Sequence, residues 1–263
     1  MNPFSVNSSW FSVFSIVSLR YFILAGLAFL IYYVWKKKKW ASFKIQLRFP
    51  ANKDYRRELL YSAITIFVFS MIPWLILGNP EIKKHTTWYS DIEQYGTLYF
   101  WLAFPLMLIM HDTYFYFTHR LMHHPKLFKL FHLTHHKSTN PSPLAAFAFH
   151  PLEALVEIGI LVLYLFTIPV MKAHLFFFFL FMMLYNVYGH LGWEWYPAGF
   201  HRTKIGRWIN TSVNHNQHHQ FFKGNYGLYF LFWDRMLGTI RKDYDQQFDE
   251  VDRRREAHNK TYN

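Results

Sequence analysis

Long apolar runs constrain the fold of this chain more than any other feature of its sequence. A helix needs about 20 apolar residues to cross the hydrocarbon core of a bilayer. Five such runs occupy residues 10–35 (interrupted by Arg20), 59–78, 95–116, 152–168 and 173–188. The last two are short for free spans, so they form either a full hairpin or a shallower one. We therefore predict an all-α, polytopic membrane helical bundle with about four or five spans.

The distribution of positive charge predicts how this bundle is oriented. The formal net charge is +12, and residues 36–58 carry nine Lys and Arg, against two in residues 79–94. Basic connections remain on the cytoplasmic side of a membrane. Counting spans from there places residues 119–150 and 190–263 on that same side, as a helical cap. Because the basic residues flank apolar runs, they indicate anionic lipid surfaces rather than nucleic acid.

Histidine is the unusual residue of this chain. Of 16 histidines, 14 lie between His111 and His219, and there is no cysteine. The absence of cysteine excludes disulfides, thiolate zinc sites and cysteine-ligated iron–sulfur clusters. The histidines form an HxxxH box at residues 119–123 and HxxHH boxes at 132–136 and 215–219. On a helix, positions three and four apart share a face, so each box can direct two or three imidazoles toward one place.

The number of imidazoles indicates two metal ions. The boxes contain eight histidines, whereas one ion takes about four to six ligands. His190 is a ninth candidate, because it shares a helical face with Asn186 and Glu194 where the fifth run ends. The predicted ligands are His119, His123, His132, His135, His136, His190, His215, His218 and His219. Imidazole binds iron, zinc, copper and nickel, so the ligand count does not select the metal.

Polar residues near the boxes are candidates for orienting these imidazoles. A ligating histidine commonly donates its second ring N–H to a carboxylate or carbonyl group. We assign supporting roles to His111, Asp112, His150, Asn186, Glu194 and Asn214. Packing or helix capping is the alternative for these residues, and Glu194 could also be a ligand. Structural or surface roles are expected for His85, His124, His174 and His258.

These motifs resemble those of the fatty acid hydroxylase / sterol desaturase superfamily. The similar stretch begins at residues 111–120 and continues through the HxxHH box, residues 148–153, His190 and the last box. It covers about residues 95–240. Only residues 124–131 separate the first two boxes, a closeness that resembles this group rather than the acyl-CoA desaturases. The superfamily's members include sterol desaturases, fatty acid hydroxylases and alkylglycerol monooxygenases, and the first and last of these are the most similar.

The resemblance implies a membrane oxidoreductase in which the histidines hold two iron ions. Such an enzyme uses O₂ to hydroxylate or desaturate a lipid, and zinc can replace iron in purified protein. The electrons would come from a separate cytochrome b5-type or ferredoxin-type protein. A basic face of Arg202, Lys204, Arg207, Arg241 and Lys242 either steers that partner or lies near anionic lipid. The implied domains are residues 1–94 (membrane spans and basic connector), 95–240 (catalytic) and 241–263 (charged tail).

Two other functions use similar residues. A membrane zinc enzyme would need no reductant, but the chain has no HExxH motif and more histidines than one catalytic zinc requires. A metal transporter would hold its ions near the middle of the bilayer, whereas the boxes lie at or beyond the ends of the apolar runs. The sequence leaves open the lipid, the choice between hydroxylation and desaturation, the electron donor and the oligomeric state.

Overall fold

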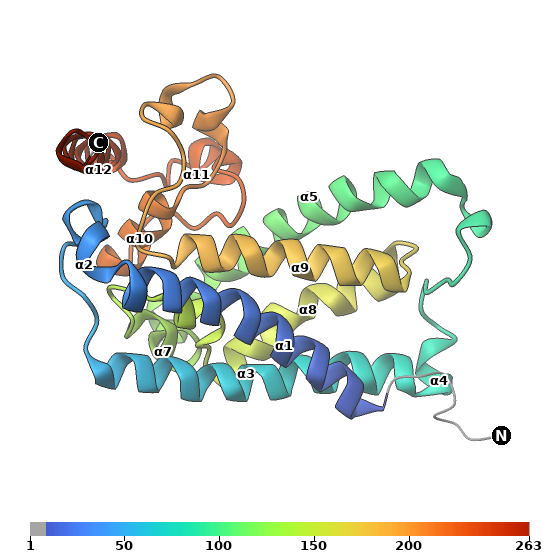
Figure 1. The fold of residues 1–263 in the computed structure, drawn as a ribbon. Coiled ribbons are helices and arrows are strands. Elements are labelled where there is room, and N and C mark those ends of the chain that lie inside the picture. The colour runs from blue at the N-terminus through green and yellow to red at the C-terminus, as the bar shows by residue number, and fades with distance from the viewer. Residues whose placement is uncertain (1–8, 263) are drawn as a thin grey trace.

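The fold is helical throughout the part of the chain that the structure, a computed structural model, describes, which is residues 9–262 (Figure 1). Within those residues the only extended pairing consists of isolated bridges. The all-α prediction is therefore confirmed. The long helices are α1 (Trp10–Phe29, continued by the π-helical turn Leu30–Trp35), α3 (Asn52–Gly78), α5 (Gly96–Met122), α8 (Pro151–Thr167), α9 (Lys172–Gly189) and α12 (Tyr244–Tyr262).

Shorter helices connect them and build the end of the bundle that carries the histidine boxes. The short α-helices are α2 (Lys37–Trp40), α4 (Pro80–Lys83), α6 (Pro125–Phe131), α7 (Leu133–His136), α10 (Ser212–Phe221) and α11 (Phe232–Met236). Single 3₁₀ turns occupy Ala41–Phe43, Ile92–Gln94, Pro143–Phe147, Phe200–Arg202 and Gly206–Trp208. In Figure 1, α2, α7, α10 and α12 lie at one end of the bundle, and α4 lies at the other.

The long helices pack side by side around one apolar core. Helix α1 packs on α3 and α9, α3 packs on α8, and α5 packs on α8 and α9. Their inner faces contribute buried Tyr21, Phe69, Met107, Tyr164 and Phe178. The outer faces are also apolar: Leu98 and Trp101 of α5 are 75% and 65% exposed. A helix that is apolar on all sides is typical of a bilayer environment.

Within residues 9–262, three helices are long and apolar enough to cross a membrane, by length and composition. They are Trp10–Trp35, Asn52–Gly78 and Lys172–Gly189. Helix α5 runs six residues past the predicted limit at Tyr116, and so carries His119 on the same helix as its apolar surface. Helix α8 has 17 residues. The number of spans, four or five, stays a prediction.

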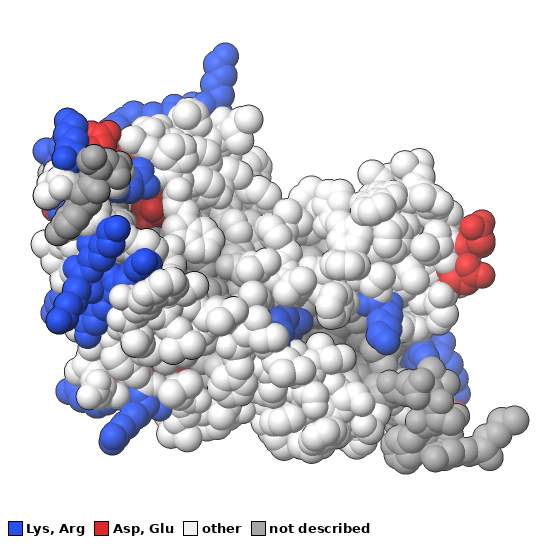
Figure 2. Space-filling view, viewed as in Figure 1, with Lys and Arg blue, Asp and Glu red and all other residues white. Residues whose placement is uncertain are grey.

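Charged residues are few, although not absent, along the middle of the molecule. Figure 2 shows Lys and Arg gathered at the end that carries α2 and α12, and a mostly uncharged surface along the long helices. Helix α12 belongs to this end and packs on α10 through buried Tyr244, Phe248 and Val251. The C-terminal segment expected as a charged tail is therefore a packed helix for most of its length.

The connector between α1 and α3 holds the loops that border the histidine boxes. The hydroxyl of Tyr33 lies 3.0 Å from the carbonyl oxygens of both Pro141 and Leu191. The buried Lys44 donates to Asn140 Oδ1 at 2.8 Å. Both side chains approach Gly192, whose φ of +84° suits glycine. A Cβ atom there would lie 2.9 Å from the Tyr33 hydroxyl oxygen and 3.1 Å from Lys44 Nζ.

Replacing Gly192 with alanine should destabilise the fold by roughly 1–3 kcal/mol, because it combines an unfavourable φ with overpacking. The measurement is the thermal unfolding midpoint in detergent. Gly26→Ala is the matched control, since nothing lies within 4 Å of its added Cβ and alanine favours a helix by about 0.5–1 kcal/mol. Equal midpoints for the two variants would contradict this account of Gly192.

Candidate metal centre

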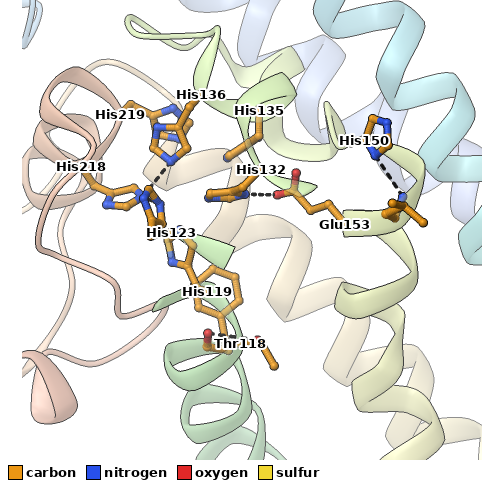
Figure 3. A network of polar contacts seen from close by, with 12 residues as sticks. Thr118, His119, His123, His132, His135, His136, His150, Glu153, His218 and His219 are labelled. Carbon is orange, nitrogen blue, oxygen red and sulfur yellow. Dashed lines mark hydrogen bonds and ion pairs between the residues drawn. The ribbon is translucent and has the colours of Figure 1, made fainter. Parts of the chain in front are cut away.

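The nine predicted ligands come together in two groups at the capped end of the bundle. Within each group the candidate ligand atoms all lie within 4.8 Å of one another. The first group, here called the five-histidine cluster, is His119, His123, His132, His136 and His218. The second, the four-histidine cluster, is His135, His190, His215 and His219. Figure 3 shows members of both groups directed toward a common region.

Each HxxHH box contributes to both clusters. In the second box, His132 and His136 enter the five-histidine cluster and His135 enters the other. In the third box the assignment is reversed, because His215 and His219 join the four-histidine cluster and His218 joins the first. Positions i and i+4 therefore serve one cluster and position i+3 the other. This division follows from the turn of a helix, in which i+3 and i+4 diverge to either side of position i.

Backbone carbonyls fix the protonation of four of these rings. His119 Nδ1 lies 2.9 Å from the Tyr226 oxygen, and His218 Nδ1 lies 2.8 Å from the Gly224 oxygen. In the same way, His190 and His219 reach the carbonyl oxygens of Asn186 at 2.8 Å and Ser138 at 3.0 Å. A carbonyl only accepts, so each Nδ1 carries the hydrogen. Each neutral ring then presents an Nε2 lone pair.

These Nε2 atoms face one another across each cluster. His218 Nε2 lies 3.1 Å from His123 Nε2 and 3.0 Å from His136 Nε2. In the other cluster, His190 Nε2 lies 3.1 Å from His219 Nε2. His190 and His219 both point lone pairs into that contact, so no proton joins them. A bound cation would satisfy both nitrogens, and the imidazole-only donor set therefore fits a metal ion in each cluster.

Burial keeps these imidazoles neutral. Of the nine, only His123 is half-buried and the rest are buried. The pKa values of His132, His136 and His218 lie well below the usual range, because burial and then the neighbouring imidazoles oppose a positive charge. The neutral ring is the form that binds metal. His132 Nε2 is buried and has no hydrogen-bond partner among residues 9–262.

Glu153 orients His132, although it is not among the residues predicted from the sequence to support the ligands. Its Oε1 accepts a hydrogen bond of 2.6 Å from His132 Nδ1 (Figure 3). The carboxylate is buried in the first turn of α8. Within residues 148–153, His150 is the residue predicted to orient a ligand. Its side chain accepts from the Leu152 amide and caps α8. The sequence feature that could have indicated this role is the position of Glu153, an acidic residue, at the start of an apolar run.

Two of the six residues assigned supporting roles lie on α5 and anchor the loop after α10. His111 Nδ1 lies 3.0 Å from Tyr229 Oη. Asp112 accepts from the amides of Tyr229 and Phe230, at 2.9 and 3.1 Å. Both therefore hold the chain just beyond Tyr226, whose carbonyl orients His119.

Apart from His150, which caps α8, the other three predicted supporting residues lie around α9 and α10. Asn186 reaches His190 through its backbone oxygen, while its side chain donates to the Ala146 oxygen at 2.8 Å. Glu194 accepts from Tyr188 Oη and the Val213 amide, and so fixes the start of α10. The buried side chain of Asn214 has no hydrogen-bond partner within residues 9–262. None of these side chains hydrogen-bonds a candidate ligand directly, whereas Glu153 does so by accepting from His132.

Replacing Glu153 with glutamine should weaken metal binding by about 10–100-fold, the usual effect of losing the carboxylate that orients a ligating histidine. The measurement is metal retained per chain after dialysis against graded chelator. Glu157→Gln is the matched control, because it removes a carboxylate one turn further along α8 and leaves the His132 bond intact. Equal retention in both variants would argue against this role for Glu153.

The metal-free protein should lose stability as the pH falls below about 6.5. Unfolded histidines take up protons near that value, whereas the buried rings of His132, His136 and His218 resist protonation in the folded state. The unfolded chain then binds more protons, so each such ring costs up to about 1.4 kcal/mol per pH unit. Unfolding midpoints measured between pH 7.5 and pH 5.5 test this, and a midpoint independent of pH would contradict it.

Comparison with known proteins supports the resemblance seen in the sequence. The fatty acid hydroxylase family model matches residues 104–239. A Delta(7)-sterol 5(6)-desaturase of Leptosphaeria maculans is 28% identical over 87% of this chain and 60% of its own length. One from Aspergillus fumigatus is 31% identical over the same shares. Mouse lathosterol oxidase is 28% identical over 67% of this chain and 60% of its own.

The chain spans about three fifths of the length of these curated relatives. No solved structure matches it. The family match covers the histidine boxes, both clusters and Glu153. The chain therefore belongs to the fatty acid hydroxylase family, within the sterol desaturase-like superfamily.

Proposed function

We propose that this protein is a membrane oxidoreductase that uses O₂ and electrons from a separate protein to desaturate or hydroxylate a sterol-like lipid. The observation that carries the proposal is the pair of imidazole clusters, whose lone pairs converge in a family of lipid oxidoreductases. The relatives named above are a Delta(7)-sterol 5(6)-desaturase and a lathosterol oxidase. These names favour a sterol over an alkylglycerol or a fatty acyl chain, and desaturation over hydroxylation.

We assign one iron ion to the five-histidine cluster and one to the four-histidine cluster. Two bound irons would supply the activation of O₂ and the removal of hydrogen from an unactivated C–H bond. Imidazole binds zinc at least as well as ferrous iron, so zinc in purified protein is compatible with this proposal. Copper and nickel are the other metals that the donor set accepts.

Side chains and backbone carbonyls of this chain would keep the ligands neutral, hold their orientation and exclude bulk water from them. The carbonyl oxygens of Asn186, Gly224 and Tyr226 and the carboxylate of Glu153 hold the outer ring nitrogens. Burial of all candidate ligands except His123 excludes bulk water. Such exclusion protects a reactive site from side reactions. The chain then selects which carbon of the lipid comes within reach.

Helix α5 supports access from the membrane. It carries the exposed apolar residues Leu98 and Trp101 and, five turns later, the buried His119. A lipid lying along the bundle would therefore approach the clusters without leaving an apolar environment. We propose that the histidine-rich end faces the cytoplasm, because the basic connector of residues 36–58 lies at that end.

The number of electrons that the reaction consumes shows that it requires an electron donor. Reduction of O₂ to water takes four electrons, and desaturation supplies two of them from the two C–H bonds that break. The other two must come from a donor. In hydroxylation one oxygen atom enters the lipid and the other becomes water, with the same demand. A zinc enzyme or a metal transporter, the competing functions, would need no donor.

Purified protein should consume O₂ only when iron, a reductant and a suitable lipid are all present. The measurement combines metal analysis with O₂ uptake, using a Delta(7)-sterol, a phospholipid and an alkylglycerol in parallel. Two metals per chain and sterol-dependent uptake with a new double bond are expected. Replacing His190 with alanine should lower both the metal content and uptake, whereas His124→Ala, an exposed helix cap, should leave both unchanged.

Failure of O₂ uptake after iron reconstitution, with every lipid, would refute the oxidoreductase proposal. Retention of one metal with hydrolytic activity would favour the zinc enzyme. Metal-dependent flux across sealed vesicles would favour the transporter.

A further inference from the structure

A shallow groove lies directly over the five-histidine cluster. It measures about 470 Å³ and lies where the loop after α10 meets the segment before α12. Its lining includes Lys223, Gly224 and Tyr226 from the first segment and Arg241 and Lys242 from the second. The groove is separate from the lipid-facing surface of α5 described above.

The floor of the groove is bonded to the candidate ligands. The carbonyl oxygen of Gly224 accepts from His218, and that of Tyr226 accepts from His119. The Tyr226 ring centroid is 5.2 Å from that of His123 and 5.6 Å from that of His218. One hydrogen bond or one ring contact therefore separates the surface from the cluster.

The cluster also comes nearest to solvent on this side. His123 is the only half-buried candidate ligand, and its ring packs on Phe128 of α6 at 5.3 Å. Phe128 in turn contacts Phe222, with ring centroids 6.0 Å apart. Helix α6 and the groove therefore form one continuous surface around His123. The four-histidine cluster is fully buried.

This surface carries more basic than acidic side chains. Lys126 and Lys129 of α6 and Lys223 and Lys242 of the groove are all exposed. Residues 119–137 contain no Asp or Glu. Asp243 lines the groove and is paired with Arg241, with Oδ2 2.9 Å from Nη2. The other acidic residue of residues 220–243 is Asp234. Asp234 is buried and accepts hydrogen bonds from the amides of Tyr226 and Gly227.

The positive surface is narrower than the basic face expected from the sequence. Arg202 is paired with Asp249, at 2.7 Å for one of its two contacts. It lines a different groove, together with Asp245, Asp252 and Glu256. Arg207 lies over the ring of Trp208. Arg241 and Lys242 are the members of the expected face that line the groove over the five-histidine cluster. Arg241 is paired with Asp243, and Lys242 also borders the second groove, so Lys242 is the charge, unpaired within residues 9–262, that the expected face contributes here.

We propose that an acidic, one-electron carrier protein docks on this surface, defined by Lys126, Lys129, Lys223 and Lys242, and delivers electrons to the five-histidine cluster. The inference rests on the proposed function, which requires two donor electrons for each turnover. The carrier is oxidised by one electron at each encounter, so two encounters complete the demand. Charge complementarity accelerates such encounters and makes them sensitive to salt.

The test uses the full chain in nanodiscs of uncharged phosphatidylcholine, with a soluble acidic cytochrome b5-type haem domain as probe. The variant is Lys223→Glu with Lys242→Glu. The matched control is Lys38→Glu with Lys204→Glu, which changes the same charge at two other exposed lysines. The association rate constant is measured at low and high ionic strength, together with metal content and with O₂ uptake driven by the haem domain or by dithionite.

The groove variant should associate about tenfold more slowly at low ionic strength, with the difference fading near 0.5 M salt. Haem-driven uptake should fall in parallel. Metal content and dithionite-driven uptake should match those of the unmodified protein, and the control should change association less than about twofold.

Equal slowing in the variant and the control would overturn the docking surface. If the unmodified protein consumes no O₂ with either reductant, the proposed function fails. The association measurement still decides the docking surface in that case, because it does not depend on turnover.

Discussion

The structure depends on buried imidazole nitrogens that face one another with lone pairs. In water each nitrogen would bind a solvent hydrogen, but the two clusters lie inside the bundle. Leaving a buried acceptor unpaired costs about 1–3 kcal/mol, and His190 and His219 meet with no hydrogen between them. A cation in each cluster would remove that penalty. The free energy of metal binding would then be part of the free energy that holds α5, α7, α9 and α10 together.

Helix α3 contributes to this arrangement although it carries no histidine. The buried Glu58 accepts from Ser138 Oγ at 2.8 Å and from Ser142 Oγ. Arg57 donates to Ser138 Oγ as well, at 3.0 Å. The carbonyl oxygen of Ser138 accepts from His219 Nδ1. The second helix of the bundle thus supports a candidate ligand more than 150 residues away, and it lies outside the part of the chain that the family model matches.

The features that could be predicted are those that depend on short stretches of sequence. Apolar runs predict the helices, and therefore the helical fold. The spacing within each box predicts which histidines share a helical face, and therefore that nine imidazoles come together. The roles of Glu153, Glu58 and Ser138 depend on contacts between distant segments, and no local pattern marks them. Helix α3 begins at Asn52, before its apolar run, because Asp54 caps its polar first turn by accepting from the Ala51 amide. The division of each box between two clusters required the positions of α7 and α10 relative to each other.

That division would couple metal binding in the two clusters. Helices α7 and α10 each contribute histidines to both clusters, so an ion bound in one cluster would order the same helical turns that the other needs. Binding of the first ion would include the entropic cost of ordering these turns, and binding of the second would not. Thermodynamic linkage makes such an effect reciprocal and gives positive cooperativity. The chain should therefore pass between empty and fully loaded forms, with few half-loaded molecules, and a single damaged box should empty both clusters together.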